Sequence, residues 1–317
     1  MKLFVIKATI FCALVAAIFC AISFSFDVDP DKGNSFVSAI VDKHKRLDET
    51  KENRLILVGG SNLPFGIDSK KIEEELHFKV TNLGLLAGFG RDFILNEAIS
   101  VVKPNDVIVL SLEYELYDPA NVPGAALIER AQYAFPEAKS YYTFSPTMYL
   151  HLAYDHFRKS FNFSHRWLEP DKPNAVYSRD AINAYGDVFI DRPASIVNGF
   201  DLEKNVLTRM QSLGDVQIFR DLSEKCKQVG AKVFIVFPNY PKKMYEKNKD
   251  AIDDTYSLIQ KEIPFIPVLG TPETFLGDDP DFFDTIYHLT TPAAARRTEA
   301  LVALLKQNGI VAPDSGL

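Results

Sequence analysis

Short apolar runs alternate with longer segments of mixed apolar and charged residues along most of the chain after residue 53. The first run, Leu55 to Val58, has four large apolar residues in a row and ends at two glycines, which Ser61 follows. A run of this kind is typical of a strand that is buried on both faces in a parallel sheet. Ligands bind at the carboxyl ends of the strands in such sheets, so Ser61 is expected where a substrate can reach it.

The same pattern predicts further strands and the helices between them. The expected strands cover residues 78–81, 107–112, 232–237 and 265–269. The expected helices begin at residue 68 or 69, cover 91–102, 201–213 and 215–229, run from after 241 to about 262, and cover 292–308. This alternation predicts an α/β fold, a three-layer sandwich with a parallel sheet of about five strands.

Between residues 113 and 200 the alternation of strands and helices breaks. This stretch is rich in Tyr, Phe, Pro and Asn, with helical patterns only near 125–133 and 147–161. It is interpreted as an insertion that packs over the carboxyl edge of the sheet, where lids and substrate-binding loops commonly occur.

The N-terminus carries an apolar stretch of membrane-spanning length, Ala8 to Phe26, with Lys2 and Lys7 before it and three aspartates after it. Positive charge stays in the cytoplasm, so everything after Phe26 is expected outside it, on the periplasmic or extracellular side. No Ala-x-Ala cleavage site is present, which favours an uncleaved anchor. Ala21-Ile22-Ser23 is a tolerable substitute, and cleavage there would release a secreted protein.

The chain is therefore divided into four parts: an anchor over 1–26, a juxtamembrane helix or linker over 27–52, one domain over 53–310 and a tail over 311–317. The spacing of apolar residues between Phe36 and Leu47 predicts that the second part is a helix, expected to act as a spacer. With 317 residues, 47% of them hydrophobic, the chain is long enough to bury a large core.

Charge and cysteine usage exclude several classes of function. The net charge is -7 and no basic stripe occurs, which argues against a nucleic-acid partner. Cys12 and Cys20 lie in the apolar stretch, leaving Cys226 alone in the exported part, so no disulfide is expected there. No phosphate loop, dinucleotide fingerprint or zinc spacing appears, and Pro280 and two phenylalanines interrupt the acidic cluster of residues 278–284. No cofactor or metal is expected.

A serine needs a base to become a nucleophile at neutral pH, and histidine is the usual one. Of the six histidines, His288 lies in the loop after the last predicted strand, at the edge that also holds Ser61. Asp284, four residues earlier, is suited to hold the imidazole in one tautomer. A structural interpretation stays open, in which Ser61 or Asn62 caps the next helix and Asp284 and His288 cap the final helix or bond within their loop.

Together these residues resemble the SGNH/GDSL hydrolases, in particular the bacterial membrane-anchored branch that includes the alginate- and teichoate-acylation proteins. The resemblance rests on Gly59-Gly60-Ser61-Asn62 after the first strand, a glycine-bearing loop after the second, and Asp284 to Leu289 before the last helix. It implies an SGNH-like, flavodoxin-like strand order, with Ser61 as nucleophile, His288 as general base and Asp284 as its orienting acid. The family usually places that acid three residues before the histidine, and here it is four.

The resemblance also implies donors for the oxyanion of an acyl-transfer reaction, each of which costs about 3 kcal/mol when removed. These are the Ser61 backbone N–H, a glycine of the second loop, and an asparagine after the third strand. Gly88 matches the glycine best, with Gly84 as the other possibility. Asn62 beside the nucleophile is a further candidate.

The third motif departs from the family pattern, because residues 111–115 read Ser-Leu-Glu-Tyr-Glu where an asparagine is expected. A carboxylate aimed at an oxyanion would repel it, so Glu113 and Glu115 must point elsewhere, be protonated or do other work. Asn239 after the fourth strand and the hydroxyl of Tyr114 are alternative donors.

The resemblance and the export signal imply a serine-dependent acyl-ester hydrolase or acyltransferase that acts on a cell-envelope or exported polysaccharide. Its partners would be an acylated glycan or other ester, the membrane and a membrane acyltransferase. The altered third motif favours the alternative, a catalytically silent SGNH-like module that binds glycan or assists a membrane acyltransferase.

Overall fold

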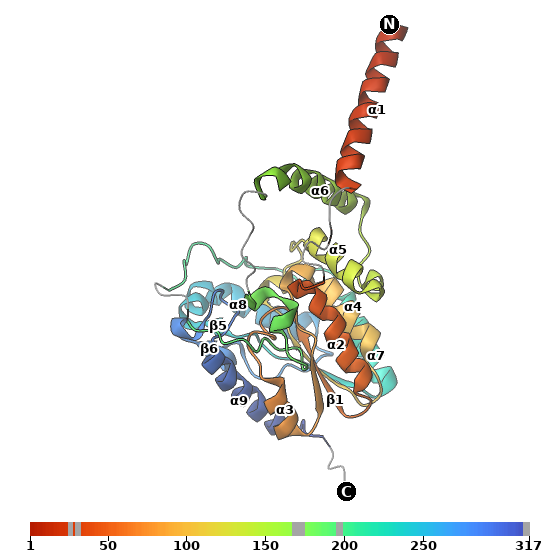
Figure 1. Ribbon diagram of the computed structural model, residues 1–317. Coiled ribbons are helices and arrows are strands. Elements are labelled where there is room, and N and C mark those ends of the chain that lie inside the picture. Colours follow the sequence, from red (N-terminus) through yellow and green to blue (C-terminus); the bar gives the residue numbers. More distant parts are fainter. Residues whose placement is uncertain (25–27, 29–32, 167–174, 195–198, 313–317) are drawn as a thin grey trace.

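The computed structural model describes residues 1–24, 28, 33–166, 175–194 and 199–312, without the side chains of 159–166 (Figure 1). Four parallel strands form its main sheet in the order β2-β1-β3-β4. They are β1 (Arg54–Gly59), β2 (Lys79–Asn82), β3 (Val107–Ser111) and β4 (Lys232–Ile235). The predicted α/β fold with a parallel sheet is therefore confirmed.

The expected fifth strand, residues 265–269, makes only an isolated parallel bridge between Val268 and Ile235. Ile235 donates its N–H to the Pro267 carbonyl at 2.9 Å and accepts from the Leu269 N–H at 2.8 Å. Pro264 and Pro267 have no N–H to donate, which limits a longer ladder. Five strands are therefore not confirmed. A separate pair, β5 (Tyr240–Pro241) and β6 (Leu276–Gly277), lies parallel elsewhere.

Nine α-helices and eight 3-10 turns are found among the described residues. The helices are α1 (Lys2–Phe24), α2 (Ile40–Glu49), α3 (Ser69–Leu76), α4 (Arg91–Val101), α5 (Ala125–Ala134), α6 (Pro146–Arg166), α7 (Gln217–Val229), α8 (Lys242–Glu262) and α9 (Thr291–Gln307). The 3-10 turns are Phe36–Ala39, Ala87–Phe89, Tyr114–Tyr117, Pro136–Ser140, Ala175–Tyr177, Arg179–Ala181, Pro272–Phe275 and Asp279–Asp281.

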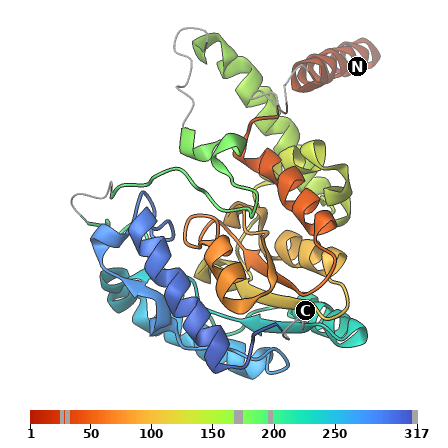
Figure 2. The same ribbon diagram turned by 60° about the horizontal axis from the view of Figure 1, so that its bottom comes forward.

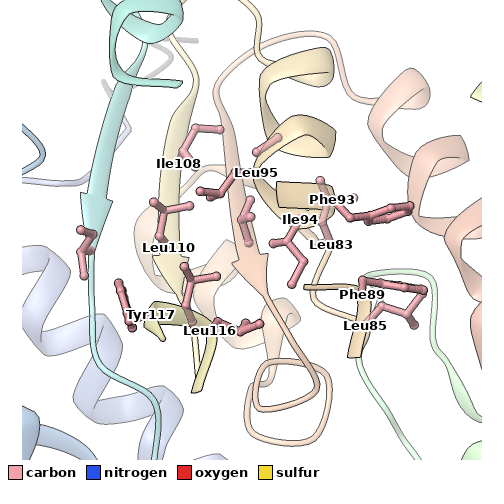
Figure 3. Packing of buried hydrophobic residues seen from close by; sticks show 14 of the residues in the cluster. Leu83, Leu85, Phe89, Phe93, Ile94, Leu95, Ile108, Leu110, Leu116 and Tyr117 are labelled. Atoms are coloured by element: carbon pink, nitrogen blue, oxygen red, sulfur yellow. The ribbon is translucent and has the colours of Figure 1, made fainter. Parts of the chain in front are cut away.

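Alternate residues of the strands face two separate cores. Ile56 and Ile108 point into a core shared with α2, α4, α7 and α8, part of which Figure 3 shows. Leu55 and Val107 point into the other core, shared with α3 and α9. Successive strand residues face opposite sides of a sheet, and helices cover both faces, so the central strands β1 and β3 are apolar along most of their length.

The expected helix over 201–213 does not form. Asn248 of α8 instead accepts the Leu207 N–H at 2.9 Å and donates to the Asn205 carbonyl at 2.9 Å. Glu262, at the end of α8, accepts the Leu213 N–H at 2.9 Å. Because side chains of α8 satisfy these backbone groups, residues 201–213 run along α8 as an irregular segment without helical structure.

The juxtamembrane part also differs from the expected spacer, because α2 and the 3-10 turn before it pack into the domain. Phe36 and Leu47 are buried in the first core. Lys43 is buried too and donates to the Asn82 carbonyl at 2.8 Å and the Gly186 carbonyl at 2.6 Å. Burial lowers the pKa of Lys43 to about 8, although Asp187 opposes the shift. This segment is part of the fold.

One helix near the N-terminus, Lys2–Ser23, is long and apolar enough to cross a membrane. It projects away from the sheet, and α5 and α6 of the insertion lie at the same end of the molecule (Figure 1, Figure 2). Residues 25–26 of the expected anchor and 313–317 of the expected tail lie outside the described residues.

Candidate functional site

Ser61 is the one residue between Arg54 and Ile67 that is not buried. It follows the end of β1 in a tight turn, where a side chain on Gly59 would overlap the Ser111 carbonyl of the neighbouring strand. The close approach of these strands therefore requires glycine just before the serine. The turn meets solvent at the position where the sequence predicts a nucleophile.

Glu113, after β3, binds the backbone of the serine turn, residues 59–62, from the buried side. Its Oε2 accepts the Gly60 N–H at 3.1 Å and its Oε1 accepts the Asn62 N–H at 3.0 Å. A Cβ on Gly60 would overlap both carboxylate oxygens. Burial raises the pKa of Glu113, and hydrogen bonds from Asn62 oppose the shift. The unexpected glutamate thus binds the turn's backbone instead of facing an oxyanion.

The Ser61 N–H lies between these two bound N–H groups and makes no hydrogen bond to any described residue. A partly exposed serine with a free backbone donor suits an acyl-transfer nucleophile, since its own N–H can bind the oxyanion.

Asn62 is fully buried and has a structural role, which corrects its assignment as an oxyanion donor. Its amide donates to the Ser111 carbonyl at 2.7 Å, and its Oδ1 accepts from the Ser111 hydroxyl at 3.0 Å. Arg297 of α9 donates to the Asn62 carbonyl at 2.6 Å and to Oδ1 at 2.9 Å. Burial lowers the pKa of Arg297 to about 9, although Glu113 opposes the shift.

Asp284 and His288 form a hydrogen-bonded pair, with Nδ1 of the imidazole 2.7 Å from Asp284 Oδ1. Tyr177 of the insertion donates its O–H to Asp284 Oδ2, and its oxygen lies 3.0 Å from the same Nδ1. Since the single phenol proton goes to Asp284, the phenol oxygen can only accept at Nδ1, so Nδ1 carries the proton. Nε2 is then the free base.

The ionised form of Asp284 is favoured in this arrangement. Burial alone would raise the pKa of this carboxyl group, but hydrogen bonds from His288 and Tyr177 outweigh burial, so the pKa lies below its ordinary value. Burial and the neighbouring Asp284 together raise the pKa of Tyr177, which keeps the phenol protonated.

Phe65 connects this pair to the serine turn. Its ring stacks on the imidazole of His288, with centroids 3.9 Å apart and planes 11° from parallel. Its N–H donates to the Ser61 carbonyl at 3.2 Å. The three predicted catalytic residues are thus gathered at one edge of the sheet, but Ser61 makes no side-chain hydrogen bond to His288 in this structure.

Arg192 of the insertion joins the two loops. It donates to the Leu289 carbonyl, next to His288, at 3.0 Å and to the Phe65 carbonyl at 3.4 Å. Its side chain is buried and takes a third bond, 2.6 Å to the Val188 carbonyl. The insertion therefore fixes the separation between the serine turn and the histidine loop.

Of the two candidate glycines, Gly84 has its N–H committed to another group, and the role of Gly88 as a donor stays a prediction. Gly84 packs against the Gly60 carbonyl, but its N–H already donates to Asn82 Oδ1 at 3.0 Å. Gly88 is exposed, and its carbonyl accepts the Gly124 N–H at 2.7 Å. No contact between Gly88 and the serine turn is found among the described residues.

The remaining candidate donors support the histidine loop. Asn239 donates to the Tyr287 carbonyl at 2.9 Å, and the Tyr287 hydroxyl donates to Glu115 at 2.6 Å. The Tyr114 hydroxyl is buried and has no partner among the described residues. The Ser61 N–H is therefore a free donor at the nucleophile itself, whereas the amides of Asn62 and Asn239 and the Gly84 N–H are committed to other groups.

Sequence reasoning missed three residues of this site: Tyr177, Arg192 and Phe65. Phe65 had a weak signal, since it lies four residues after Ser61 in the same loop. Tyr177 and Arg192 had none, because they come from the insertion, where no strand and helix pattern fixes which side chains reach the sheet edge.

No family model matches this chain, and no curated protein matches it. Among the described residues, no group of three or more His, Cys, Asp and Glu side chains is placed to hold a metal ion. In the acidic loop, Asp278 pairs with Lys242 at 3.0 Å and Asp279 pairs with Lys243 at 2.9 Å. The chemistry of the site therefore has to be argued from its own side chains.

Proposed function

We propose that this chain is a serine-dependent acyl-ester hydrolase or acyltransferase of the SGNH type, anchored by α1 outside the cytoplasm. The observation that carries the proposal is the partial exposure of Ser61 alone in a buried stretch, at the sheet edge where Phe65 links it to a histidine whose Nδ1 is bound by Asp284. The strand order β2-β1-β3-β4, with the Val268 bridge beside β4, is compatible with the flavodoxin-like order of that family.

In the proposed reaction the Ser61 oxygen attacks the ester carbonyl while His288 Nε2 takes the hydroxyl proton. The Ser61 N–H stabilises the oxyanion, and Asp284 stabilises the imidazolium. The tetrahedral intermediate then expels the alcohol, which takes the proton from His288. Water or an acceptor hydroxyl next attacks the acyl-serine carbonyl while His288 Nε2 takes its proton, and the second tetrahedral intermediate then breaks the bond to the Ser61 oxygen, which regains its proton from His288. Hydrogen bonds between nucleophile and base are often long before substrate binds, so a change of the Ser61 rotamer is expected to close the gap.

The proposed substrate is an O-acylated polysaccharide of the cell envelope or an exported glycan, and a membrane acyltransferase is the proposed protein partner. The proposed export is based on Lys2 and Lys7 in the N-terminal part of α1, since positive charge favours keeping that end in the cytoplasm. The substrate class follows from the resemblance of the serine and histidine motifs to the membrane-anchored acylation proteins.

A fluorophosphonate probe tests the nucleophile directly. The full chain in detergent or nanodiscs should be labelled, and Ser61→Ala should not be. His288→Ala should slow labelling by roughly 10²- to 10⁴-fold, because the general base is lost. Ser145→Ala, at an exposed serine of the insertion, is the matched control and should be labelled like the wild type. Equal labelling of wild type and Ser61→Ala would refute the proposal.

A catalytically silent binding module is the second candidate, and specific observations favour it. Glu113 replaces the expected asparagine, and the Gly84 N–H and Asn62 amide are committed to other groups. Fewer oxyanion donors remain than an efficient esterase uses. A folded wild-type chain that resists the probe would support this candidate, with glycan or a membrane acyltransferase as its ligand.

A further inference from the structure

Helix α6 of the insertion is held on one side by the domain. Leu152 is buried, and His156 Nε2 lies 2.7 Å from Glu129 Oε2 of α5. Residues four apart lie on the same face of a helix, so Leu152 and His156 define the face turned toward α5. The opposite face of α6 is turned away from the protein.

A second face of α6 contacts the apolar helix α1. The rings of Phe19 and Phe157 stack with centroids 4.9 Å apart, and the Ser23 hydroxyl donates to the Ala153 carbonyl at 3.2 Å. Ser23 is the last residue of the membrane-spanning candidate. Figure 1 shows α6 lying across this end of α1. The helix therefore sits at the level where α1 would leave a bilayer.

The outward face of α6 carries large apolar and aromatic side chains. Leu150 is 72% exposed and Tyr154 is 58% exposed, and Arg158 follows on the same face. Water does not favour such exposure of leucine and tyrosine. Tyrosine, leucine and arginine along one helix face are, however, typical of helices that lie in the interface between water and lipid.

We infer that α6 is an interfacial helix, and that its face formed by Leu150, Tyr154 and Arg158 lies in the headgroup region of the phospholipid bilayer that α1 spans. The occupant of this face is lipid because it continues directly from the contact with α1. Two attachments, one spanning and one lying flat, would fix the orientation of the domain, whereas α1 alone would let it swivel. The inference rests on the proposed anchoring and is independent of the serine chemistry.

Depth-dependent quenching of tryptophan fluorescence tests this placement. Trp167, the only native tryptophan, is replaced by phenylalanine, and single tryptophans are introduced as Leu150→Trp or Tyr154→Trp. Gln307→Trp at the exposed end of α9 is the water control, and Ile10→Trp in α1 is the membrane control. Each full-length variant is reconstituted in phosphatidylcholine and phosphatidylglycerol vesicles that carry a spin label at the headgroup or deep in the acyl chain.

The inference predicts that tryptophans at 150 and 154 lose most of their emission to the headgroup label and less to the deep label. Ile10→Trp should show the reverse order, and Gln307→Trp should show neither loss. If tryptophans at 150 and 154 are quenched no more strongly than the tryptophan at 307, the inference is wrong. This holds whether their emission maximum indicates contact with water or burial against another protein. Absence of quenching at Ile10 would overturn it as well, because α1 would then not span the bilayer.

Discussion

The serine turn and the histidine loop meet at one edge of the sheet, but they are held by different parts of the molecule. The turn is held from beneath by Glu113 and Arg297, which are buried within the α/β domain. The Asp284–His288 pair is contacted by Tyr177, a partly exposed residue of the insertion, while Asn239 and Arg192 bond the backbone of the histidine loop. The comparison teaches that substitutions beneath the turn should mainly change the stability of the fold, whereas substitutions around the histidine should mainly change reactivity.

The largest expected loss of folding stability comes from substitution of Arg297. Arg297→Met removes the donors to Asn62 and a buried positive charge that interacts with Glu113, so the free energy of unfolding should fall by about 3 kcal/mol. Urea unfolding of the full chain measures this change. The neighbouring Arg296→Met removes an exposed pair with Asp281 and should cost less than about 1 kcal/mol. Equal losses of unfolding free energy in Arg297→Met and Arg296→Met would contradict the structural role given to Arg297.

A smaller loss of stability is expected at Glu113. A glutamine has one acceptor oxygen, so Glu113→Gln leaves one of the two turn N–H groups unpaired at a cost of about 1–3 kcal/mol. Glu115→Gln is the matched control, because glutamine can still accept from the Tyr287 hydroxyl. The urea midpoints of both variants measure the two losses of stability. A larger loss for Glu115→Gln than for Glu113→Gln would contradict the role given to Glu113.

The smallest expected effect is on reactivity, and it concerns Tyr177 beside the histidine loop. Tyr177→Phe keeps the ring beside Phe65 but removes one hydrogen bond to Asp284, so labelling of Ser61 by the fluorophosphonate should slow about tenfold. The urea midpoint should stay near that of the wild type. Tyr133→Phe, at an exposed tyrosine, is the control and should change neither quantity.

The pH profile of this labelling separates chemistry from structure. The pKa of Asp284 is held low by His288 and Tyr177 against the opposing effect of burial, so its charge is present above that pKa and lost as pH falls through it. Without the phenol donor the pKa of Asp284 rises, and the acid limb of the profile should move to higher pH. An unchanged profile with a lowered urea midpoint would make Tyr177 a purely structural residue.

The sequence was sufficient for those features that depend on neighbouring residues. The run from Leu55 to Val58, the alternation of strands and helices, and the placing of Ser61 and His288 at one edge all follow from local patterns. The fifth strand was overestimated because an apolar run hides the effect of Pro267 within it and Pro264 just before it, which cannot donate to a ladder.

The site was less predictable where distant segments meet. The altered third motif left three possibilities for Glu113, namely pointing elsewhere, being protonated or doing other work, and only the fold reveals that its carboxylate binds the Gly60 and Asn62 N–H groups. Tyr177 lies 107 residues from Asp284 in sequence, and nothing local fixes such a pairing. Long-range side-chain contacts across the insertion therefore had to come from the structure.

Trapping an acyl-enzyme tests the proposed chemistry most directly. The full chain is mixed with p-nitrophenyl acetate, quenched in acid after short times and digested, and the peptides are analysed by mass spectrometry. The mechanism predicts an acetyl group on the peptide that contains Ser61, at a rate that falls strongly in His288→Ala. A folded chain that carries no acetyl group on Ser61, or that acetylates Ser61 equally fast without His288, would contradict it.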